Sequence, residues 1–354
     1  MEKIPFSPDE LKPIGKYFVA GRADGGRDKL NTPISPLENY MAFLNDETPC
    51  WMPNGDMITI NPSIIPDNIS RAFVQEANAT DEKGGPDMFG TMWIYEDLAG
   101  GSMVVPGNPR FTDCNDWRDA ITLPDVDSWD WEGSKKRNEE FLAGGDPVWT
   151  TQFSGLFERL ISFMDFENAA FALVDEDQED ALHDLFDAIT DVYIKIVDHC
   201  IDAYHINGYL FHDDWGSQRA PFFSKETWFA HIAPYVKKMV DYCHSRGLIF
   251  ELHSCGNTQS MTDAITSIGI DMWRPQPMND IKKMYSEYGD RIKFGIRTPI
   301  FPPGTPEDVQ IKAAWDIVAD FNIPGKYVFT NNVFESNAFR AALYEASRKA
   351  YLEH

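Results

Sequence analysis

The chain has 354 residues, of which 43% are hydrophobic and 13% aromatic. This length and composition can build a sizeable core, and they exclude a chain that is disordered throughout. The formal net charge of −25 argues against nucleic acid and membranes as partners, because a surface this acidic repels polyanions.

The N-terminal residues 1–35 are rich in proline, glycine and charge, and we expect them to form an irregular arm. The segment has no basic stretch followed by an apolar core, and no part of the chain approaches the roughly 18 apolar residues that span a bilayer. We therefore expect a soluble, cytoplasmic protein. Residues 36–354 are expected to form a single domain, and a homodimer is one alternative for its assembly.

Short apolar segments that predict strands recur along the chain, and most are followed by a helical pattern. The expected strands are 57–60, 89–97, 148–153, 208–214, 248–257, 270–275, 291–296 and 326–331. The expected helices are 35–44, 155–164, 175–204, 224–246, 258–268, 279–288, 305–321 and 336–351. This alternation predicts an α/β protein built as a (β/α)₈ TIM barrel, with a doubly wound sheet as the alternative.

Residues 105–145 interrupt the alternation with a proline- and tryptophan-containing stretch that we expect to be a long loop insertion. Loops of this length are uncommon in compact domains and usually functional, so a lid or a partner surface is one reading. The other reading is an ordered excursion whose tryptophans pack on helices. Three histidines within or just after the helix at 175–204, namely His183, His199 and His205, are expected to be structural.

The stretch 248–257 carries the strongest chemical signal. Side chains alternate between the two faces of a strand, so Glu251, His253 and Cys255 share one face. A His-x-Cys pair suits a borderline-soft ion such as Zn²⁺. The five cysteines are sparse and have no CxxC spacing, which argues against a disulfide framework.

A barrel brings the carboxyl ends of its strands to one mouth, and polar residues occur at several of these ends. Asp213 and Asp214 are catalytic candidates that could act as a general base, hold a metal or orient a histidine; the alternative is a pair that caps a helix or forms a salt bridge. Alternation allows only one of the two to face the barrel axis. Glu251 is a third catalytic candidate. The expected substrate-binding residues are Trp215, Gln218, Arg274, Gln276, Arg297 and Asn332. For the two arginines, pairing with nearby acids is an equal alternative, and for Trp215 so is core packing.

Five motifs give the chain a resemblance to the uroporphyrinogen decarboxylase superfamily, in its methyltransferase-like branch. They are HDDWGSQRAPFFS at 212–224, HSRGL at 244–248, ELHSCGN at 251–257, GIDMWRPQPMNDI at 269–281 and YGDRIKFG at 288–295. The resemblance extends more faintly over nearly the whole chain. It implies a (β/α)₈ barrel, in agreement with the strand count.

The resemblance also implies a metal site. The zinc methyltransferases of this superfamily carry His-x-Cys and a second cysteine much later; His253 and Cys255 match the first part, but no cysteine follows Cys255. Near the expected place stand Asn332 and Glu335. An oxygen ligand from Glu335 or Glu251 would replace the missing cysteine, and a protein without zinc is the alternative.

The resemblance implies a transferase that moves a methyl group between a small methylated substrate, for instance a methyl ether, and a corrinoid held by a partner protein. Zinc or an acid would assist this O-demethylation. The alternative enzyme is a decarboxylase of a tetrapyrrole or another carboxylated substrate. The paired-arginine motif of the true decarboxylases is not matched by GRADGGRD at 21–28. A non-catalytic corrinoid or tetrapyrrole binder is a third reading.

Overall fold

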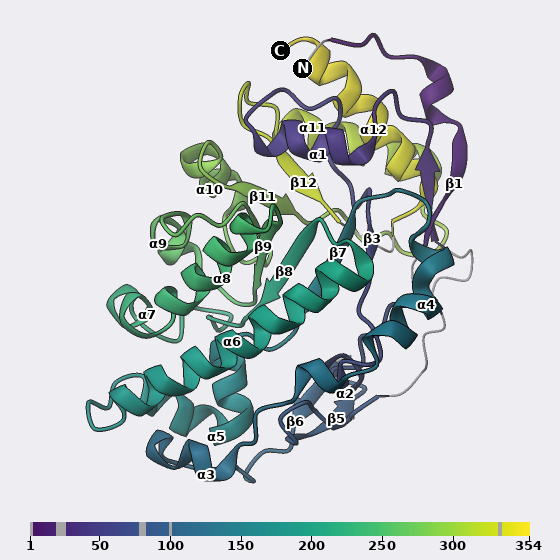
Figure 1. Ribbon diagram of the computed structural model, residues 1–354. Coiled ribbons are helices and arrows are strands. Elements are labelled where there is room, and N and C mark those ends of the chain that lie inside the picture. The colour runs from purple at the N-terminus through teal and green to yellow at the C-terminus, as the bar shows by residue number, and fades with distance from the viewer. Residues whose placement is uncertain (1–2, 19–25, 78–82, 99–100, 332–334) are drawn as a thin grey trace. The chain divides into compact units, whose positions relative to one another are not determined.

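The computed structural model describes residues 3–18, 26–77, 83–98, 101–331 and 335–354. The chain divides into two compact units. The first comprises residues 1–58, 145–147 and 271–354, and the second comprises residues 59–144 and 148–270. β3 (Ile58–Thr59) lies where the chain passes from the first unit to the second. Both units alternate strands with helices (Figure 1).

The first unit contains the N-terminal arm and the last strands of the chain. Its elements are η1 (Pro8–Leu11), β1 (Pro13–Phe18), β2 (Gly26–Leu30), α1 (Pro36–Leu44), β10 (Met272–Pro275), α10 (Ile281–Tyr288), β11 (Lys293–Ile296), α11 (Glu307–Asp320), β12 (Val328–Thr330) and α12 (Asn337–Leu352). β10, β11 and β12 are parallel neighbours in that order, whereas β1 and β2 form an antiparallel pair. The expected helix at 35–44 is confirmed as α1, which Ser35 and Glu38 cap reciprocally.

The second unit begins with short elements and continues with longer ones. Its elements are α2 (Pro66–Ser70), β4 (Gly85–Pro86), β5 (Met92–Glu96), β6 (Gly101–Val104), η2 (Cys114–Asp116), α3 (Trp117–Ala120), η3 (Val126–Ser128), α4 (Trp131–Leu142), β7 (Val148–Gln152), α5 (Leu156–Ala172), α6 (Glu179–Tyr204), β8 (Gly208–His212), α7 (Lys225–His231), α8 (Ala233–Ser245), β9 (Ile249–Ser254), η4 (Gln259–Met261) and α9 (Thr262–Thr266). β7, β8 and β9 are parallel neighbours in that order. The long helix α6 packs against α4, α5 and α8 (Figure 1).

These parallel strands followed by helices confirm the predicted α/β barrel-type fold. β8 and β9 are buried along almost their whole length, as parallel strands covered on both faces should be. Phe211 of β8 and Phe250 of β9 pack against each other with ring centroids 5.9 Å apart. This packed core fixes the positions at which the two strands end.

The expected strand at 89–97 differs from the prediction. The strand within it, β5, pairs antiparallel with β4 and β6 in a separate three-stranded sheet. Exposed Met92 and Ile94 flank buried Trp93. This alternation is typical of a sheet with one solvated face, and it distinguishes β5 from the buried parallel strands.

Two further expectations differ. The helix expected at 224–246 is two helices, α7 and α8, because Pro234 in the first turn of α8 has no N–H to continue the hydrogen bonds of α7. The expected loop at 105–145 contains four helical segments. Trp117 and Trp131 are buried, and Trp131 stacks on His199 of α6 with centroids 4.7 Å apart, so the alternative of an ordered excursion fits these residues.

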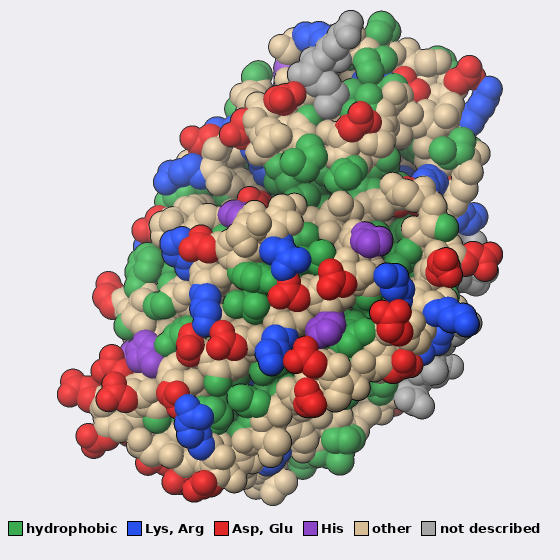
Figure 2. Space-filling model, in the orientation of Figure 1, with side chains coloured by type: hydrophobic (Ala, Val, Ile, Leu, Met, Phe, Trp, Pro, Cys, Tyr) green, Lys and Arg blue, Asp and Glu red, His purple; other side chains and the backbone are tan. Residues whose placement is uncertain are grey.

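Acidic side chains spread over the surface in Figure 2, with Lys and Arg among them. Among the described residues, no helix is both long enough and apolar enough to cross a membrane.

Candidate functional site

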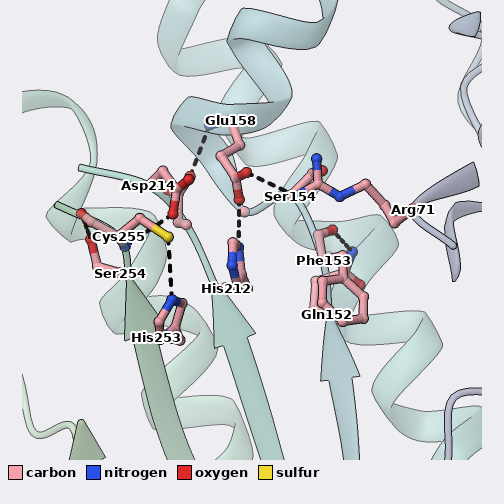
Figure 3. A network of polar contacts seen from close by, with 12 residues as sticks. Arg71, Gln152, Phe153, Ser154, Glu158, His212, Asp214, His253, Ser254 and Cys255 are labelled. Atoms are coloured by element: carbon pink, nitrogen blue, oxygen red, sulfur yellow. Dashed lines mark hydrogen bonds and ion pairs between the residues drawn. The ribbon is translucent and has the colours of Figure 1, made fainter. Parts of the chain in front are cut away.

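The candidate site lies in the second unit, where β8 and β9 end. The two strands are parallel and in register, with His212 opposite His253. Register partners on parallel strands project from the same face, and the two imidazole rings lie 4.8 Å apart between centroids. Asp214 and Cys255 each follow two residues later, so each pair repeats the strand's period of two (Figure 3).

Four potential metal donors therefore converge, from His212, Asp214, His253 and Cys255. One donor atom of each lies within 4.8 Å of the others, and all four residues are half-buried. His253 Nε2 lies 3.4 Å from Cys255 Sγ. The Cys255 backbone N–H donates to Asp214 Oδ1 at 3.0 Å, which joins the two strand ends.

The turn after β9 requires a glycine. Gly256 has a φ of +86°, which side chains with a Cβ rarely adopt. A Cβ at this position would also stand 2.0 Å from the carbonyl oxygen of Gly216. The absence of a side chain thus allows the segments that follow β8 and β9 to approach closely.

A buried carboxylate orients His212. The Nδ1–H of His212 donates to Glu158 Oε2 at 2.7 Å, and Arg71 Nη2 donates to Glu158 Oε1 at 3.2 Å (Figure 3). With Nδ1 occupied, Nε2 is the ring atom of His212 that can bind a metal. A carboxylate on the second nitrogen is the usual support of a metal-binding histidine.

Burial and charge oppose each other in this pair. Burial acts to raise the pKa of Glu158, but His212 and Arg71 outweigh it and hold that pKa at about 2. Burial likewise acts to lower the pKa of His212, and the charge and hydrogen bond of Glu158 outweigh it, so this pKa is raised. The pair is thereby held as a carboxylate and a histidine that keeps its proton on Nδ1.

The donor set and its spacing fit zinc. Two nitrogens, a sulfur and a carboxylate oxygen are the ligands that zinc prefers, and tetrahedral zinc at about 2.0–2.3 Å places its ligand atoms about 3.3–3.8 Å apart. The His253–Cys255 separation of 3.4 Å already lies in that range. All four donor atoms lie within 4.8 Å of one another, so small side-chain movements would bring the remaining donors to these separations.

Asp213 has a different role from its neighbour. It is fully buried, and its carboxylate accepts the backbone N–H groups of Leu156, Phe157 and Glu158 at 2.8–3.1 Å and the Trp215 indole N–H at 2.8 Å. These are the first N–H groups of α5, whose N-cap residue Gly155 has no side chain to cap them. The structure therefore favours helix capping over the expected catalytic role.

The remaining predicted residues lie in both units. In the second, Glu251 is fully buried in β9, Gln218 is exposed, and Trp215 is buried against Trp228 with ring centroids 5.5 Å apart. Trp215 is thus a core residue and not the wall of an open pocket, because its ring and its N–H are both used inside the protein.

In the first unit, Arg274 and Gln276 are half-buried and Arg297 is exposed. Glu335 is buried, and its carboxylate accepts from Asn54 at 2.7 Å and pairs with Arg340. Its role as a metal ligand stays a prediction, as do the substrate contacts of the other three. Asn332 lies outside the described residues.

Sequence reasoning did not include His212, Glu158 or Arg71 in the site. The signal for His212 was present, since His212 and Asp214 repeat the period-two spacing of His253 and Cys255 at the end of the preceding strand. Glu158 and Arg71 come from distant parts of the sequence, and only the fold brings them to His212.

The comparisons with known proteins agree with this architecture. The methyltransferase from Methanosarcina mazei is similar in structure with a TM-score of 0.60 and 14% identity, covering 90% of this chain and 99% of its own. A xylose isomerase-like TIM barrel protein from Mycobacterium smegmatis in complex with magnesium has a TM-score of 0.33 and 12% identity, covering 62% and 78%. At these identities the likeness concerns the fold alone, and it rests on the first structure. No curated protein matches the sequence.

The sequence model for uroporphyrinogen decarboxylase (URO-D) matches residues 159–330. The matched segment contains all four donors of the cluster. Together with the fold, this match indicates an enzyme. The resemblance drawn from the motifs is therefore confirmed over residues 159–330, where the chain matches the uroporphyrinogen decarboxylase family model.

Proposed function

We propose that this protein is a methyltransferase that moves a methyl group between a small methylated substrate and a corrinoid carried by a partner protein. The observation that carries this proposal is the convergence of His212, Asp214, His253 and Cys255 at the ends of β8 and β9. A mixed nitrogen, sulfur and oxygen donor set suits a Lewis-acidic zinc, whereas a decarboxylase that binds carboxylates through arginines has no need of it.

His212, His253 and Cys255 would hold the zinc, with His212 in place of the family's later cysteine, and the fourth position, beside Asp214, would stay open for the substrate. When bound, zinc supplies a Lewis acid that stabilises negative charge on the atom from which the methyl group departs. Glu158 keeps the proton of His212 on Nδ1, and Arg71 holds Glu158 in place. The Cys255 N–H fixes the orientation of Asp214.

The substrate class is the one that the resemblance implies, and the charge balance of its reaction defines what the site must supply. A methyl ether that gives its methyl group, as a CH₃⁺ equivalent, to the cobalt(I) of a corrinoid leaves an alkoxide or phenolate that retains the bonding electron pair. That anion requires an electrophile or a proton. Zinc supplies the first, and the carboxyl group of Glu251 or Asp214 is the candidate proton source if no metal takes part.

Aromatic side chains next to the donors are compatible with an apolar substrate. The ring of Phe153 lies 5.7 Å from the ring of His212, and Phe73 packs on Phe153 with centroids 4.8 Å apart. Phe73 is 38% exposed, so this aromatic pair extends from the cluster to the surface. Such a surface would contact the uncharged part of a methyl ether.

The test combines metal content with methyl transfer. Protein purified without chelator is analysed for zinc and assayed with methyl ethers and free cobalt(I) corrinoid, beside a His253→Ala/Cys255→Ala double variant. We expect the wild type to hold about one zinc per chain more than the variant and to methylate corrinoid, which the variant should not do. A wild type that holds no more zinc than the variant, or a variant that methylates corrinoid equally well, would contradict the zinc-assisted mechanism.

The alternative decarboxylase function has the family match in its favour. The same preparation tests it, by release of CO₂ from uroporphyrinogen and from smaller carboxylated substrates. CO₂ release that the double variant retains, without methyl transfer, would replace the proposed function by this one. Binding of corrinoid without either reaction would favour the non-catalytic reading.

A further inference from the structure

A second group of metal-binding side chains lies on the helices of the second unit, apart from the donors at the ends of β8 and β9. It consists of Glu179 and His183 on α6 and His231, the last residue of α7. One donor atom from each lies within 4.8 Å of the other two. Glu179 and His183 are four residues apart, so they project from the same face of α6.

The distances between these donor atoms are close to those in a zinc site. His231 Nδ1 lies 3.3 Å from His183 Nε2. Two imidazole nitrogens bound to a tetrahedral zinc at about 2.0–2.1 Å stand about 3.3–3.4 Å apart, so the two rings already have the required separation. Glu179 Oε1 is 3.9 Å from His183 Nε2, and its side chain is half exposed and free to rotate closer.

A third helix orients the central histidine. Tyr235 on α8 lies with its hydroxyl 2.7 Å from His183 Nδ1. A partner on Nδ1 fixes the ring and leaves Nε2, the atom that faces His231 and Glu179, as the donor. The same arrangement of one nitrogen held by the protein and one directed at the ion is typical of structural and catalytic zinc ligands.

The distance of 3.3 Å alone would also suit a hydrogen bond between two neutral imidazoles. Such a bond needs neither a carboxylate on the third side nor a partner on the second nitrogen of His183. The group is also accessible, since the side chains of His183 and Glu179 are 31% and 50% exposed. An ion can therefore enter from solvent, and a water molecule can complete its coordination.

We propose that Glu179, His183 and His231 form a second site for Zn²⁺ or a similar late transition-metal ion, which connects α7 to α6. This assigns two of the chain's histidines to metal binding, although the sequence suggested that His183 is not a ligand. The site would stabilise the segment that leads from the end of β8 into α7. It does not depend on the proposed methyl transfer.

The test uses the His253→Ala/Cys255→Ala variant as background, so that the first cluster cannot account for bound metal. Zinc per chain is measured by equilibrium dialysis at buffered free Zn²⁺ and by elemental analysis. We expect about one zinc per chain in the background. We expect His183→Ala and His231→Asn each to lose it, and Glu179→Gln to bind it at least about tenfold more weakly.

The matched control is His199→Ala, which removes a histidine of the same helix that binds Asp127 and no donor of the group. It should retain the zinc. Circular dichroism verifies that each variant is folded. If His183→Ala does not fold, His231→Asn still tests the site, because it preserves the size and polarity of the side chain. The proposal is overturned if the background binds no zinc, or if its zinc persists in both His183→Ala and His231→Asn.

Discussion

At the scale of single residues, the pairing of Glu158 with His212 leads to a prediction about metal affinity. Glu158 contacts no metal, so it would act by positioning His212 and keeping the proton on Nδ1. We expect Glu158→Gln to weaken zinc binding at the first cluster about 10–100-fold, the usual effect of losing such a partner. Competition with a zinc-binding dye, in a His183→Ala background, measures this affinity.

The control for this prediction is Arg71→Lys. It keeps a cation near Glu158 and leaves the His212 hydrogen bond intact, so its affinity for zinc should change less than that of Glu158→Gln. Equal zinc affinity in Glu158→Gln and wild type would mean that His212 is not a ligand, or that its orientation does not depend on Glu158.

Asp213 shows how adjacent residues with the same chemistry can serve different purposes. Its carboxylate satisfies three N–H groups at the start of α5, and burial with the nearby charge of Glu158 raises its pKa to about 7. Asp213→Ala would leave these donors buried without an acceptor. We expect a loss of about 2–5 kcal/mol in the free energy of unfolding, measured by urea denaturation.

Asp213→Asn is the matched variant, because its amide oxygen can still accept some of these hydrogen bonds. It should lose less stability than Asp213→Ala and retain zinc binding. If Asp213→Ala is as stable as the wild type but inactive in methyl transfer, the capping role is wrong and Asp213 belongs to the catalytic group.

The donors show what sequence can and cannot supply at this scale. His253 and Cys255 were predictable because two residues on one strand share a face by geometry alone. The donors at the end of β8 could not be assigned to the same site from the sequence, because this needs the register that places His212 beside His253. The contact of Glu158 with His212 depends on how α5 packs, and no local pattern encodes it.

At the scale of elements, hydrophobic periodicity predicted the buried parallel strands and most helices. It failed where two structures share one pattern. An apolar run such as 89–97 suits a barrel strand or a hairpin strand, and pairing with β4 and β6 decided the outcome. The break between α7 and α8 was predictable from Pro234, since a proline interior to a helical pattern interrupts the hydrogen bonds.

The arm of the first unit is attached to α12 by a buried ion pair. Arg348 Nε and the Tyr344 hydroxyl donate to Glu10 Oε2 at 2.8 and 2.7 Å. Burial acts to raise the pKa of Glu10, but these hydrogen bonds and the charge of Arg348 outweigh it, so its pKa is lowered in the folded protein. Stability from this pair is therefore fully present above the ordinary glutamate pKa of about 4.3.

We predict that this contribution is lost as the pH falls below that value and through the lowered pKa of folded Glu10. Glu10→Gln should destabilise the protein by on the order of 3–5 kcal/mol at neutral pH, because it leaves the Arg348 charge buried without its partner. The difference between the two proteins should shrink as the pH approaches the folded pKa. Urea denaturation at pH 7, 5 and 4 measures it. A difference that stays constant over this range would contradict the prediction.

At the scale of the whole molecule, the excess of acidic residues has a thermodynamic consequence. A net charge of −25 destabilises the compact state through repulsion, and unfolding relieves it by moving the charges apart. Ion pairs on the surface act in the opposite direction, such as Lys237 with Asp241 and Lys312 with Asp316. Each exposed pair contributes only about 0–1 kcal/mol, so the repulsion should dominate.

The salt dependence of stability shows which of these two effects is larger, because salt screens both the repulsion and the ion pairs. The Debye length falls from about 30 Å at 0.01 M salt to about 8 Å at 0.15 M, which suppresses the long-range repulsion most. We therefore predict that the unfolding temperature rises over this range, by roughly 1–2 °C for each kcal/mol of repulsion that is removed, given the length of 354 residues. The measurement is calorimetry on protein stripped of metal by a chelator, so that zinc binding does not contribute. Sodium and choline chloride should act alike, since screening depends on ionic strength and not on the ion. A fall in unfolding temperature would mean that the surface ion pairs outweigh the excess negative charge.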